Sequence, residues 1–434
     1  MTDDGQHEIM KAVTGSRLEQ PVVRESAAVS WRLISAGPPS KEKGPIYNKT
    51  KTIKVTPRPD HETTTNHIML RHHSSHLVEQ LILLFTLITS TVSIPARKMM
   101  VTQSGADTQF SVTGTNAAYP RANYLANGQI LGVYTDFPED SQVLTLVTSS
   151  DNGNSWSLTG TAARKAVKDG MLDNGYVLQI PSGRVLLAFR NHDRDASGRI
   201  TIFRITICRS DDNGASWNFH SDAVVVNATP ENNGVWEPFL RNAHDGSLQL
   251  YFSRERSALD QDSVMLSSRD GGSTWNDEKL ISGQVESRSR DGMVGITEIS
   301  RGQLIAVFET NENGGPFFLE TVSSWDDGAS WGSRKTLYRS PTGKNAGAPQ
   351  IALVGNTLLV SFMTDEDNNI GNAASWIDVA DSKLLISKDG GGTWSKTTVF
   401  QEPSFWPGLT VLNSGNGFLY LAGSNGIKSR KFTL

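Results

Sequence analysis

Residues 149–156 read Ser-Ser-Asp-Asn-Gly-Asn-Ser-Trp, and their pattern, Ser-x-Asp-x-Gly-x-Ser/Thr-Trp, returns four more times along the chain. The aspartates of the five copies, separated by 61, 58, 56 and 63 residues, are Asp151, Asp212, Asp270, Asp326 and Asp389. Such near-constant spacing indicates one structural unit repeated along the chain. The carboxylate can accept N–H groups across a β-turn, glycine supplies a positive φ, and tryptophan covers the turn. We therefore interpret these copies as structural turns that lie away from any functional site.

A second repeat lies between these turns and predicts the fold. Each copy has a start motif, an apolar strand, a turn and another apolar strand, and the six starts are marked by Pro120, Gly175, Pro238, Gly292, Pro349 and Pro407. A repeat of about 57 residues accommodates a four-stranded antiparallel sheet. We predict an all-β, six-bladed β-propeller of four-stranded antiparallel blades over residues 105–434. The last repeat has room for three strands, so we expect residues 110–113 to supply the fourth and close the ring.

Composition limits the possible functions. Of 434 residues, 41 are Lys or Arg and 45 are Asp or Glu, which gives a net charge of −4 and argues against a nucleic-acid partner. The 39 glycines and 10 tryptophans suit a turn-rich all-β protein. The single cysteine, Cys208, excludes an intramolecular disulfide framework and a cysteine-based zinc site. We expect a monomer.

The N-terminal quarter differs from the rest. Residues 1–68 are polar and lack apolar periodicity, so we expect a disordered or spurious upstream extension. Residues 69–96 have the pattern of a signal peptide: Met69, the positive Arg71, an apolar run from Leu81 to Ile94, and small residues before Ala96. A signal anchor is the alternative. The Asn227-Ala228-Thr229 sequon is compatible with secretion and glycosylation. The tract His72, His73 and His76 lacks a carboxylate or cysteine to complete a metal site, and we expect no metal and no cofactor.

Two sets of residues are expected to meet at one rim of the propeller's central funnel, because the innermost strand starts there and the second strand returns to it. The start motifs offer Arg121, Asn174, Trp236, Glu237, Arg290, Asp291, Gln350 and Trp406. The ends of the following apolar runs offer Asp136, Arg190, His192, Arg254, Glu309 and Asp365. Carboxylates, arginines and aromatic rings suit a carbohydrate. The arginines could instead pair with neighbouring carboxylates, the aspartates could cap turns, and the histidine could make a structural hydrogen bond.

Glu237 and Glu309 are the candidate catalytic residues. Glu237 lies between Trp236 and Pro238 at the start of an inner strand, and Glu309 follows the apolar run 304–308. A carboxyl group next to an apolar wall has a perturbed pKa, as catalytic acids often do.

The five turns resemble the Asp boxes of sialidase-like propellers, and the segments between them resemble glycoside hydrolase family 93. The resemblance lies in Gly234–Leu240 (GVWEPFL), Tyr251–Glu255 (YFSRE), Asp260–Asp262 (DQD), Arg290–Met293 (RDGM), Ala306–Glu309 (AVFE), Ala346–Gln350 (AGAPQ) and Ser361–Asp367 (SFMTDED). Residues 1–68 have no counterpart in that family.

This resemblance implies a secreted, largely fungal exo-α-1,5-L-arabinanase that releases arabinobiose from the non-reducing end of linear arabinan with retention of configuration. It implies that Glu237 is the general acid/base and Glu309 the nucleophile. Retaining hydrolysis independently requires two carboxyl groups roughly 5–5.5 Å apart and no metal. Two alternatives remain: an exo-sialidase, which would need three arginines around a carboxylate and a tyrosine nucleophile, and a carbohydrate-binding propeller without catalysis.

The signal-peptide pattern makes a prediction about the exported protein. We expect cleavage near Ala96, because small residues precede it. N-terminal sequencing of protein collected from the medium should begin within a few residues of Arg97. A folded cytosolic protein that retains Met1 would contradict this expectation.

Overall fold

The structure, a computed structural model, describes residues 101–283, 288–368 and 375–434, which belong to one unit spanning Lys98–Leu434. The predicted extension at 1–68 and the predicted signal peptide at 69–96 lie outside the described residues. Within the described ranges, no helix is long and apolar enough to cross a membrane. The elements are β-strands together with a short 3-10 helix, η1 (Ile377–Val379).

The strands form six antiparallel sheets, which are the predicted blades. Blades 1 and 2 contain β3 (Ala117–Tyr124), β4 (Ile130–Asp136), β5 (Ser141–Ser149), β6 (Ser157–Ala166), then β7 (Gly170–Gln179), β8 (Val185–Arg194), β9 (Ile200–Ser210) and β10 (Asn218–Asn227). Blades 3 and 4 contain β11 (Gly234–Asn242), β12 (Leu248–Ser257), β13 (Asp260–Ser268), β14 (Asn276–Ser282), then β15 (Gly292–Ser300), β16 (Gln303–Thr310), β17 (Phe318–Ser324) and β18 (Gly332–Tyr338). Blade 5 contains β19 (Ala346–Val354), β20 (Thr357–Thr364), β21 (Asp381–Ser387) and β22 (Ser395–Phe400).

Blade 6 is completed by the N-terminal side of the unit. It contains β23 (Phe405–Val411), β24 (Gly417–Gly423) and β25 (Lys428–Thr433), and β25 pairs with both β1 (Thr102–Gln103) and β2 (Thr108–Gln109). The prediction placed the closing strand at 110–113, which is wrong by a few residues. The reason is Phe110, whose ring is fully buried against Tyr134 and Trp156 and therefore turns into the core after the paired segment.

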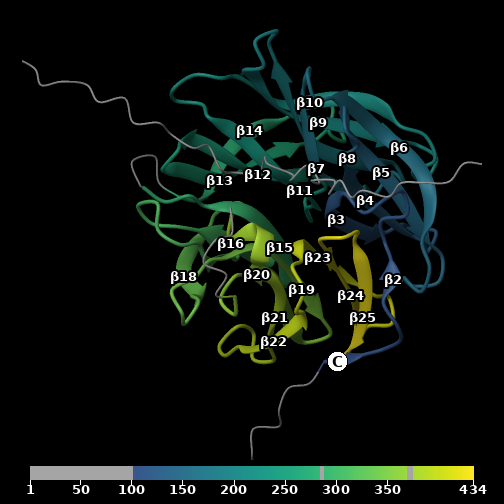
Figure 1. The fold of residues 1–434 in the computed structure, drawn as a ribbon, viewed down its shortest axis with the longest axis vertical. Coiled ribbons are helices and arrows are strands. Elements are labelled where there is room, and N and C mark those ends of the chain that lie inside the picture. Colours follow the sequence, from purple (N-terminus) through teal and green to yellow (C-terminus); the bar gives the residue numbers. More distant parts are fainter. Residues whose placement is uncertain (1–100, 284–287, 369–374) are drawn as a thin grey trace, which may run out of the picture. The chain divides into compact units, whose positions relative to one another are not determined.

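The six blades form a closed ring (Figure 1). Each innermost strand packs against the innermost strand of the next blade, and β23 packs against β3. A hydrogen bond of 2.9 Å from Thr410 Oγ1 to the Ala122 carbonyl oxygen joins blade 6 to blade 1. The prediction of a six-bladed propeller is confirmed.

All five Asp boxes are turns between the third and fourth strands of blades 1 to 5. In the third box, Asp270 Oδ1 accepts the Thr274 N–H at 2.9 Å, and Asp270 Oδ2 accepts the Thr274 hydroxyl at 2.7 Å. Ser268 Oγ accepts the Gly272 N–H at 2.8 Å. Gly271 and Gly272 both have positive φ, 69° and 88°, as a tight turn between twisted strands requires. The interpretation of the boxes as structural turns therefore agrees with their geometry.

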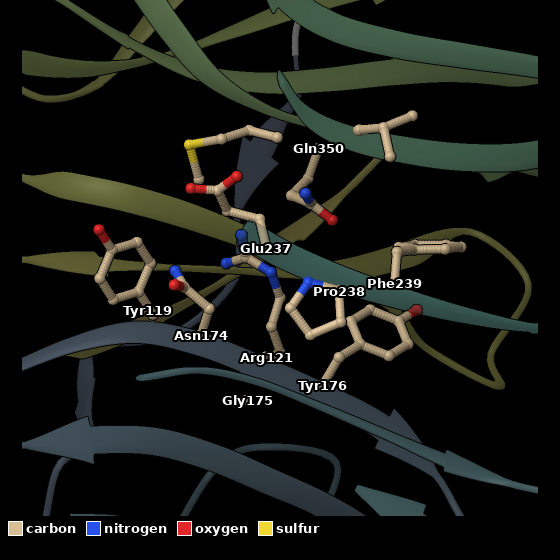
Figure 2. Close-up of a pocket in the computed structure, with 11 residues that line it drawn as sticks. Tyr119, Arg121, Asn174, Gly175, Tyr176, Glu237, Pro238, Phe239 and Gln350 are labelled. Atoms are coloured by element: carbon tan, nitrogen blue, oxygen red, sulfur yellow. The ribbon is translucent and has the colours of Figure 1, made fainter. Parts of the chain in front are cut away.

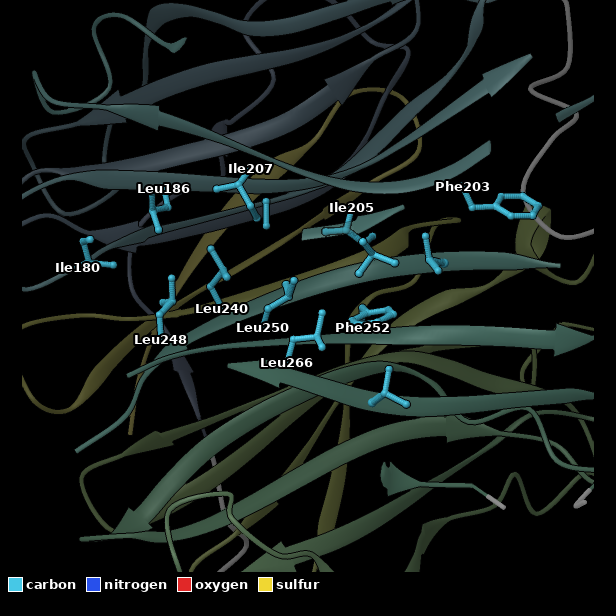
Figure 3. Packing of buried hydrophobic residues seen from close by; sticks show 14 residues of the cluster. Ile180, Leu186, Phe203, Ile205, Ile207, Leu240, Leu248, Leu250, Phe252 and Leu266 are labelled. Atoms are coloured by element: carbon cyan, nitrogen blue, oxygen red, sulfur yellow. The ribbon is translucent and has the colours of Figure 1, made fainter. Parts of the chain in front are cut away.

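The boxes also connect neighbouring blades. A Cβ on Gly153 would lie 2.6 Å from the Leu419 side chain of blade 6, and one on Gly214 would lie 3.0 Å from Leu131 of blade 1. Glycine is therefore needed for close approach as well as for the turn. Deeper in the molecule, apolar side chains of adjacent blades interlock, as Figure 3 shows for Leu186 and Ile205 of blade 2 against Leu250 of blade 3.

The box tryptophans provide a stability test. Trp275 packs against the core shared by blades 2 and 3, and its indole N–H donates to the Gly272 carbonyl oxygen at 3.0 Å. We expect Trp275→Ala to lower the free energy of unfolding by about 3 kcal/mol, since the ring is partly buried. Denaturant unfolding measures this change, and catalytic activity should persist at temperatures below the new transition.

Trp325 supplies the matched control, because it occupies the first variable position of the fourth box and is 62 % exposed. Trp325→Ala should change the free energy of unfolding by less than about 0.5 kcal/mol. Unchanged stability in Trp275→Ala together with complete loss of activity would contradict the structural assignment of the boxes.

Candidate active site

Each innermost strand carries a β-bulge near its start. At the bulge the pairing register with the second strand is interrupted and one residue adopts a left-handed backbone conformation. The six residues and their φ angles are Tyr119 (55°), Asn174 (58°), Glu237 (42°), Met293 (53°), Ala348 (52°) and Trp406 (44°). Positive φ is costly for residues other than glycine, and bulges that redirect side chains are frequent next to active sites.

The sequence favours a bulge at these points. Proline follows the left-handed residue in four blades, at Pro120, Pro238, Pro349 and Pro407. Proline has no N–H to donate to the ladder, so it is tolerated where pairing is interrupted. The start motifs of the sequence repeat are therefore the bulges of the structure.

Blade 4 departs from the predicted alignment of the repeats. The prediction used Gly292 as its marker and placed Arg290 or Asp291 at the rim, but the left-handed residue is Met293. Arg290 precedes β15 and donates to Glu255 Oε1 at 2.8 Å, whereas Asp291 is fully buried in an ion pair with Arg334. Blade 4 has no proline after its bulge, so the register of the motif was wrong by two residues.

A pocket opens among the innermost strands around Glu237 (Figure 2). Four predicted site residues meet there: Arg121, Asn174, Glu237 and Gln350. The remaining lining comes from Tyr119, Gly175, Tyr176, Pro238, Phe239, Met293 and Val294. Residues from five blades therefore converge on one site, although they are far apart in the sequence.

Glu237 is held in its protonated form at neutral pH. Burial and, after it, the nearby charge of Glu309 raise the pKa of its carboxyl group to about 8, against the opposing effect of Arg190. The Ser253 hydroxyl lies 3.0 Å from Glu237 Oε2. A carboxyl group with a pKa near the working pH is suited to donate and recover a proton.

Glu309 has a different environment. Burial raises the pKa of its carboxyl group, but the backbone N–H of Ala348 donates to Oε2 at 2.7 Å and favours the charged form. A Cβ on Gly347 would lie 2.5 Å from the same oxygen, so only glycine leaves room for this carboxylate. The two glutamates are thus close enough to interact and differ in proton affinity, which is how one acid and one nucleophile are separated.

Asn174 lies in the pocket with unused hydrogen-bonding capacity. Its side chain is 5 % exposed, and neither its amide nitrogen nor its amide oxygen has a partner among the described residues. Unpaired buried polar groups cost stability and call for an explanation. An amide is suited to bind a hydroxyl group, which both donates and accepts a hydrogen bond.

Arg121 lies at the side of the pocket near blade 6. Its Nη1 donates to the carbonyl oxygens of Pro120 at 2.7 Å and of Trp406 and Pro407 at 3.3 Å. Burial lowers the pKa of this guanidinium to about 10, although Glu237 opposes that shift. Gln350 donates to the Pro349 carbonyl oxygen at 2.8 Å.

Trp236 forms a rigid platform beside Glu237. Its indole N–H donates to Glu255 Oε2 at 2.9 Å, the Arg190 guanidinium lies 4.9 Å from the ring centre, and His192 contacts the ring edge. Arg190 is itself paired with the buried Asp173 at 3.1 Å.

His192 supports this platform from within the fold. It is fully buried, its Nε2 lies 2.9 Å from the Val235 carbonyl oxygen, and burial lowers its pKa well below the usual value. The structure therefore places it behind the platform, in the structural role that the sequence had left as an alternative.

The opposite side of the site is apolar. Tyr119 and Trp406 stack with their ring centres 4.3 Å apart, and Met293, Ala348 and Trp376 pack around them. Trp406 therefore stacks on Tyr119, which lines the pocket and which sequence reasoning missed, but Trp406 is not itself a lining residue.

Three of the predicted site residues do not line the pocket and instead contact other parts of the fold. Arg254 reaches outward across blade 3 and pairs with Glu278 on the outermost strand. Asp136 accepts the Thr145 hydroxyl at 2.6 Å, and Asp365 accepts the Asn345 N–H at 2.7 Å. These carboxylates hold neighbouring strand segments together, so their contacts are structural, although they join separate segments and do not cap turns.

Sequence reasoning missed several residues that surround the glutamates: Tyr119, Met293, Ala348, Ser253 and Glu255. Tyr119 and Ala348 could have been found by aligning the start motifs on the residue before the proline, whereas Met293 is followed by Val294 and offers no such marker. Ser253 and Glu255 carry no comparable signal, because they reach the site through strand pairing. Across the described residues, no group of three or more His, Cys, Asp or Glu side chains is arranged to hold a metal ion.

Comparisons with solved structures place this site in a known fold. A Penicillium chrysogenum α-L-arabinanase complexed with arabinobiose is 19 % identical, covers 77 % of this chain and 98 % of its own, and has a TM-score of 0.58. A Fusarium graminearum glycoside hydrolase family 93 α-L-arabinofuranosidase with arabinobiose is 18 % identical, with the same coverage and TM-score. A Dyadobacter fermentans protein of unknown function is 15 % identical, covers 77 % of this chain and 99 % of its own, and also has a TM-score of 0.58.

These similarities concern the fold, because the identities are low. No curated protein matches the chain in sequence. The family profile of the BNR repeat-like domain matches residues 124–360, more than half of the 434 residues, and includes four of the five Asp boxes. The chain therefore belongs to the BNR repeat-like domain family.

Proposed function

We propose that this protein is a retaining exo-acting glycoside hydrolase that cleaves linear α-1,5-L-arabinan and releases arabinobiose. The observation that carries the proposal is the pair of Glu237, which lines the axial pocket, and Glu309, whose charge acts on it: one carboxyl group is protonated near neutral pH and the other accepts a backbone N–H. The resemblance of the motifs to family 93 supports the substrate. The arabinobiose held by two structures of the same fold supports it as well.

The residues around the pair suit a neutral sugar. Glu309 attacks the anomeric carbon while Glu237 protonates the leaving oxygen, and Glu237 then removes a proton from the water that hydrolyses the intermediate. Asn174 provides a donor and an acceptor for ring hydroxyls, and the lining rings of Tyr119, Tyr176 and Phe239 offer apolar surface for the sugar.

An exo-sialidase is the alternative substrate class, and the arginines argue against it. That chemistry needs several guanidinium groups directed at one carboxylate. Here Arg254 is paired with Glu278, and Arg290 with Glu255. The pattern of residues 69–96 supports secretion, which would bring the enzyme to a polymer outside the cell.

Incubation with defined substrates tests the proposed function. We expect arabinobiose to be released from linear arabinan, and no sialic acid to be released from a sialoside. Chromatography of the products measures both reactions. Binding of arabinan without release of sugar would support the binding propeller instead, and release of sialic acid would overturn the proposal.

The two glutamates are expected to give different variants. Glu309→Ala and Glu237→Ala should each reduce arabinan hydrolysis by about four orders of magnitude or more while the protein stays folded. Azide should restore activity toward activated aryl arabinofuranosides in both. The product should have inverted configuration with Glu309→Ala, where azide replaces the nucleophile, and retained configuration with Glu237→Ala, where azide intercepts the covalent intermediate.

The configuration of the azide product, measured by NMR, decides the roles. Inverted product from Glu237→Ala would exchange the two assignments. Substantial arabinan hydrolysis by both variants would place the active site elsewhere on the propeller.

The pKa shifts predict the pH dependence of the reaction. Glu237 must be protonated to act as the acid, so kcat/KM should fall above about pH 8, roughly tenfold for each further pH unit. Glu309 must be ionised, so kcat/KM should also fall on the acid side, with a midpoint above 4.5 because burial raises its pKa. Rate measurements on linear arabinan between pH 3 and 10 check both limbs, and an alkaline midpoint below pH 6 would contradict the assignment.

A further inference from the structure

Ser253 connects the acid to the neighbouring blade. It lies on β12 opposite Trp236 in the strand ladder, directly where the bulge of β11 displaces Glu237. Its hydroxyl oxygen is 3.0 Å from Glu237 Oε2 and accepts the N–H of Met293 at 3.2 Å. Met293 is the left-handed residue of blade 4, whose second strand carries Glu309. One fully buried hydroxyl therefore joins the bulges of two blades, each of which carries one of the glutamates.

The direction of these hydrogen bonds follows from the groups involved. A backbone N–H can only donate, so Met293 occupies a lone pair of the serine oxygen. The hydroxyl hydrogen remains for Glu237 Oε2, which accepts it most strongly when the carboxylate is charged. Ser253 therefore favours the charged form of Glu237 and limits the increase in proton affinity that burial produces.

We propose that Ser253 is the positioning residue of this site: its hydroxyl fixes the Glu237 carboxyl group against blade 4 and tunes how readily Glu237 gives up its proton. The inference rests on the proposed function only for its kinetic consequence. The hydrogen bond and its effect on proton affinity can be measured without substrate.

Other charged groups around Glu237 also shift its protonation equilibrium, so a test of Ser253 must leave them unchanged. Glu309 on β16 raises the pKa of Glu237, whereas Arg190 on β8 and Arg290 before β15 lower it. Arg121 on β3 also interacts with Glu237. Replacement of Ser253 by alanine leaves all four groups in place.

Ser263 supplies a matched control. It lies opposite Ser253 on the next strand of the same blade, is likewise fully buried, and its hydroxyl has no hydrogen-bond partner among the described residues. Ser263→Ala therefore removes the same atom from the same layer of the fold without touching Glu237.

Infrared difference spectra across a pH titration of the full chain test the proposal directly. The protonated carboxyl band that disappears in Glu237→Gln is assigned to Glu237. In wild type this band should titrate near pH 8. In Ser253→Ala its midpoint should move upward by roughly one pH unit, the effect of one hydrogen bond to a charged group. In Ser263→Ala it should stay at the wild-type value.

A second variant covers the case in which Ser253→Ala does not fold. Ser253→Cys keeps a group of similar shape with a weaker donor, so it should shift the midpoint upward by less. An unchanged or lowered midpoint in whichever folded variant is measured would overturn the proposal. An equal upward shift in Ser263→Ala would also overturn it, because the effect would then come from general loosening of the blade.

The kinetic readout separates this inference from the proposed function. On linear arabinan, Ser253→Ala should move the alkaline limb of the kcat/KM profile upward by the same roughly one pH unit as the infrared midpoint. It should also lower kcat about tenfold to a hundredfold, because a displaced acid protonates the leaving oxygen less well. KM should change little. A shifted infrared midpoint in a protein that does not cleave arabinan would uphold Ser253 and reject the proposed function. Cleavage of arabinan with an unshifted midpoint would reject Ser253 alone.

Discussion

The β-bulge at the start of each innermost strand is the constraint on which the site depends. It places one residue per blade in a left-handed conformation, and in blade 3 that residue is Glu237. Without the bulge, strict alternation along β11 would decide which side chains face the axis. The strain of six such residues is tolerated because the blades pack around them in a closed ring with an interlocked apolar core. The bulges at the site therefore destabilise the backbone locally, and packing between the blades compensates for that loss of stability.

Electrostatic asymmetry follows from this placement. Both glutamates are half-buried, but Glu309 receives a backbone N–H from the bulge of blade 5, at Ala348. Glu237 accepts the Ser253 hydroxyl and lies in the field of Glu309. Glu237 is therefore protonated at neutral pH. Two identical side chains acquire different roles from the backbone geometry of neighbouring blades.

Most positive charge in the funnel is already neutralised. Arg190 pairs with Asp173, and Arg290 with Glu255. These pairs fix the orientation of Trp236, because Glu255 also accepts its indole N–H and Arg190 lies over its ring. The charged residues therefore build a rigid wall around a pocket that presents amide and aromatic groups. That surface fits an uncharged sugar better than an anionic one.

The sequence by itself determined the architecture, because the two repeats have nearly constant spacing and turn chemistry is local: Asp270, Gly272 and Trp275 interact within a few residues. It also singled out Glu237 and Glu309 as candidates, because each lies beside an apolar strand and within a motif that resembles family 93. Only the tertiary structure decided which residues join them. Strand register brought Ser253 beneath Glu237, and ring closure placed Trp406 on Tyr119. Arg254 is paired across the strands with Glu278, and in blade 4 the buried Met293 lines the pocket in place of Arg290. These outcomes depend on contacts between residues distant in sequence, which no local pattern encodes.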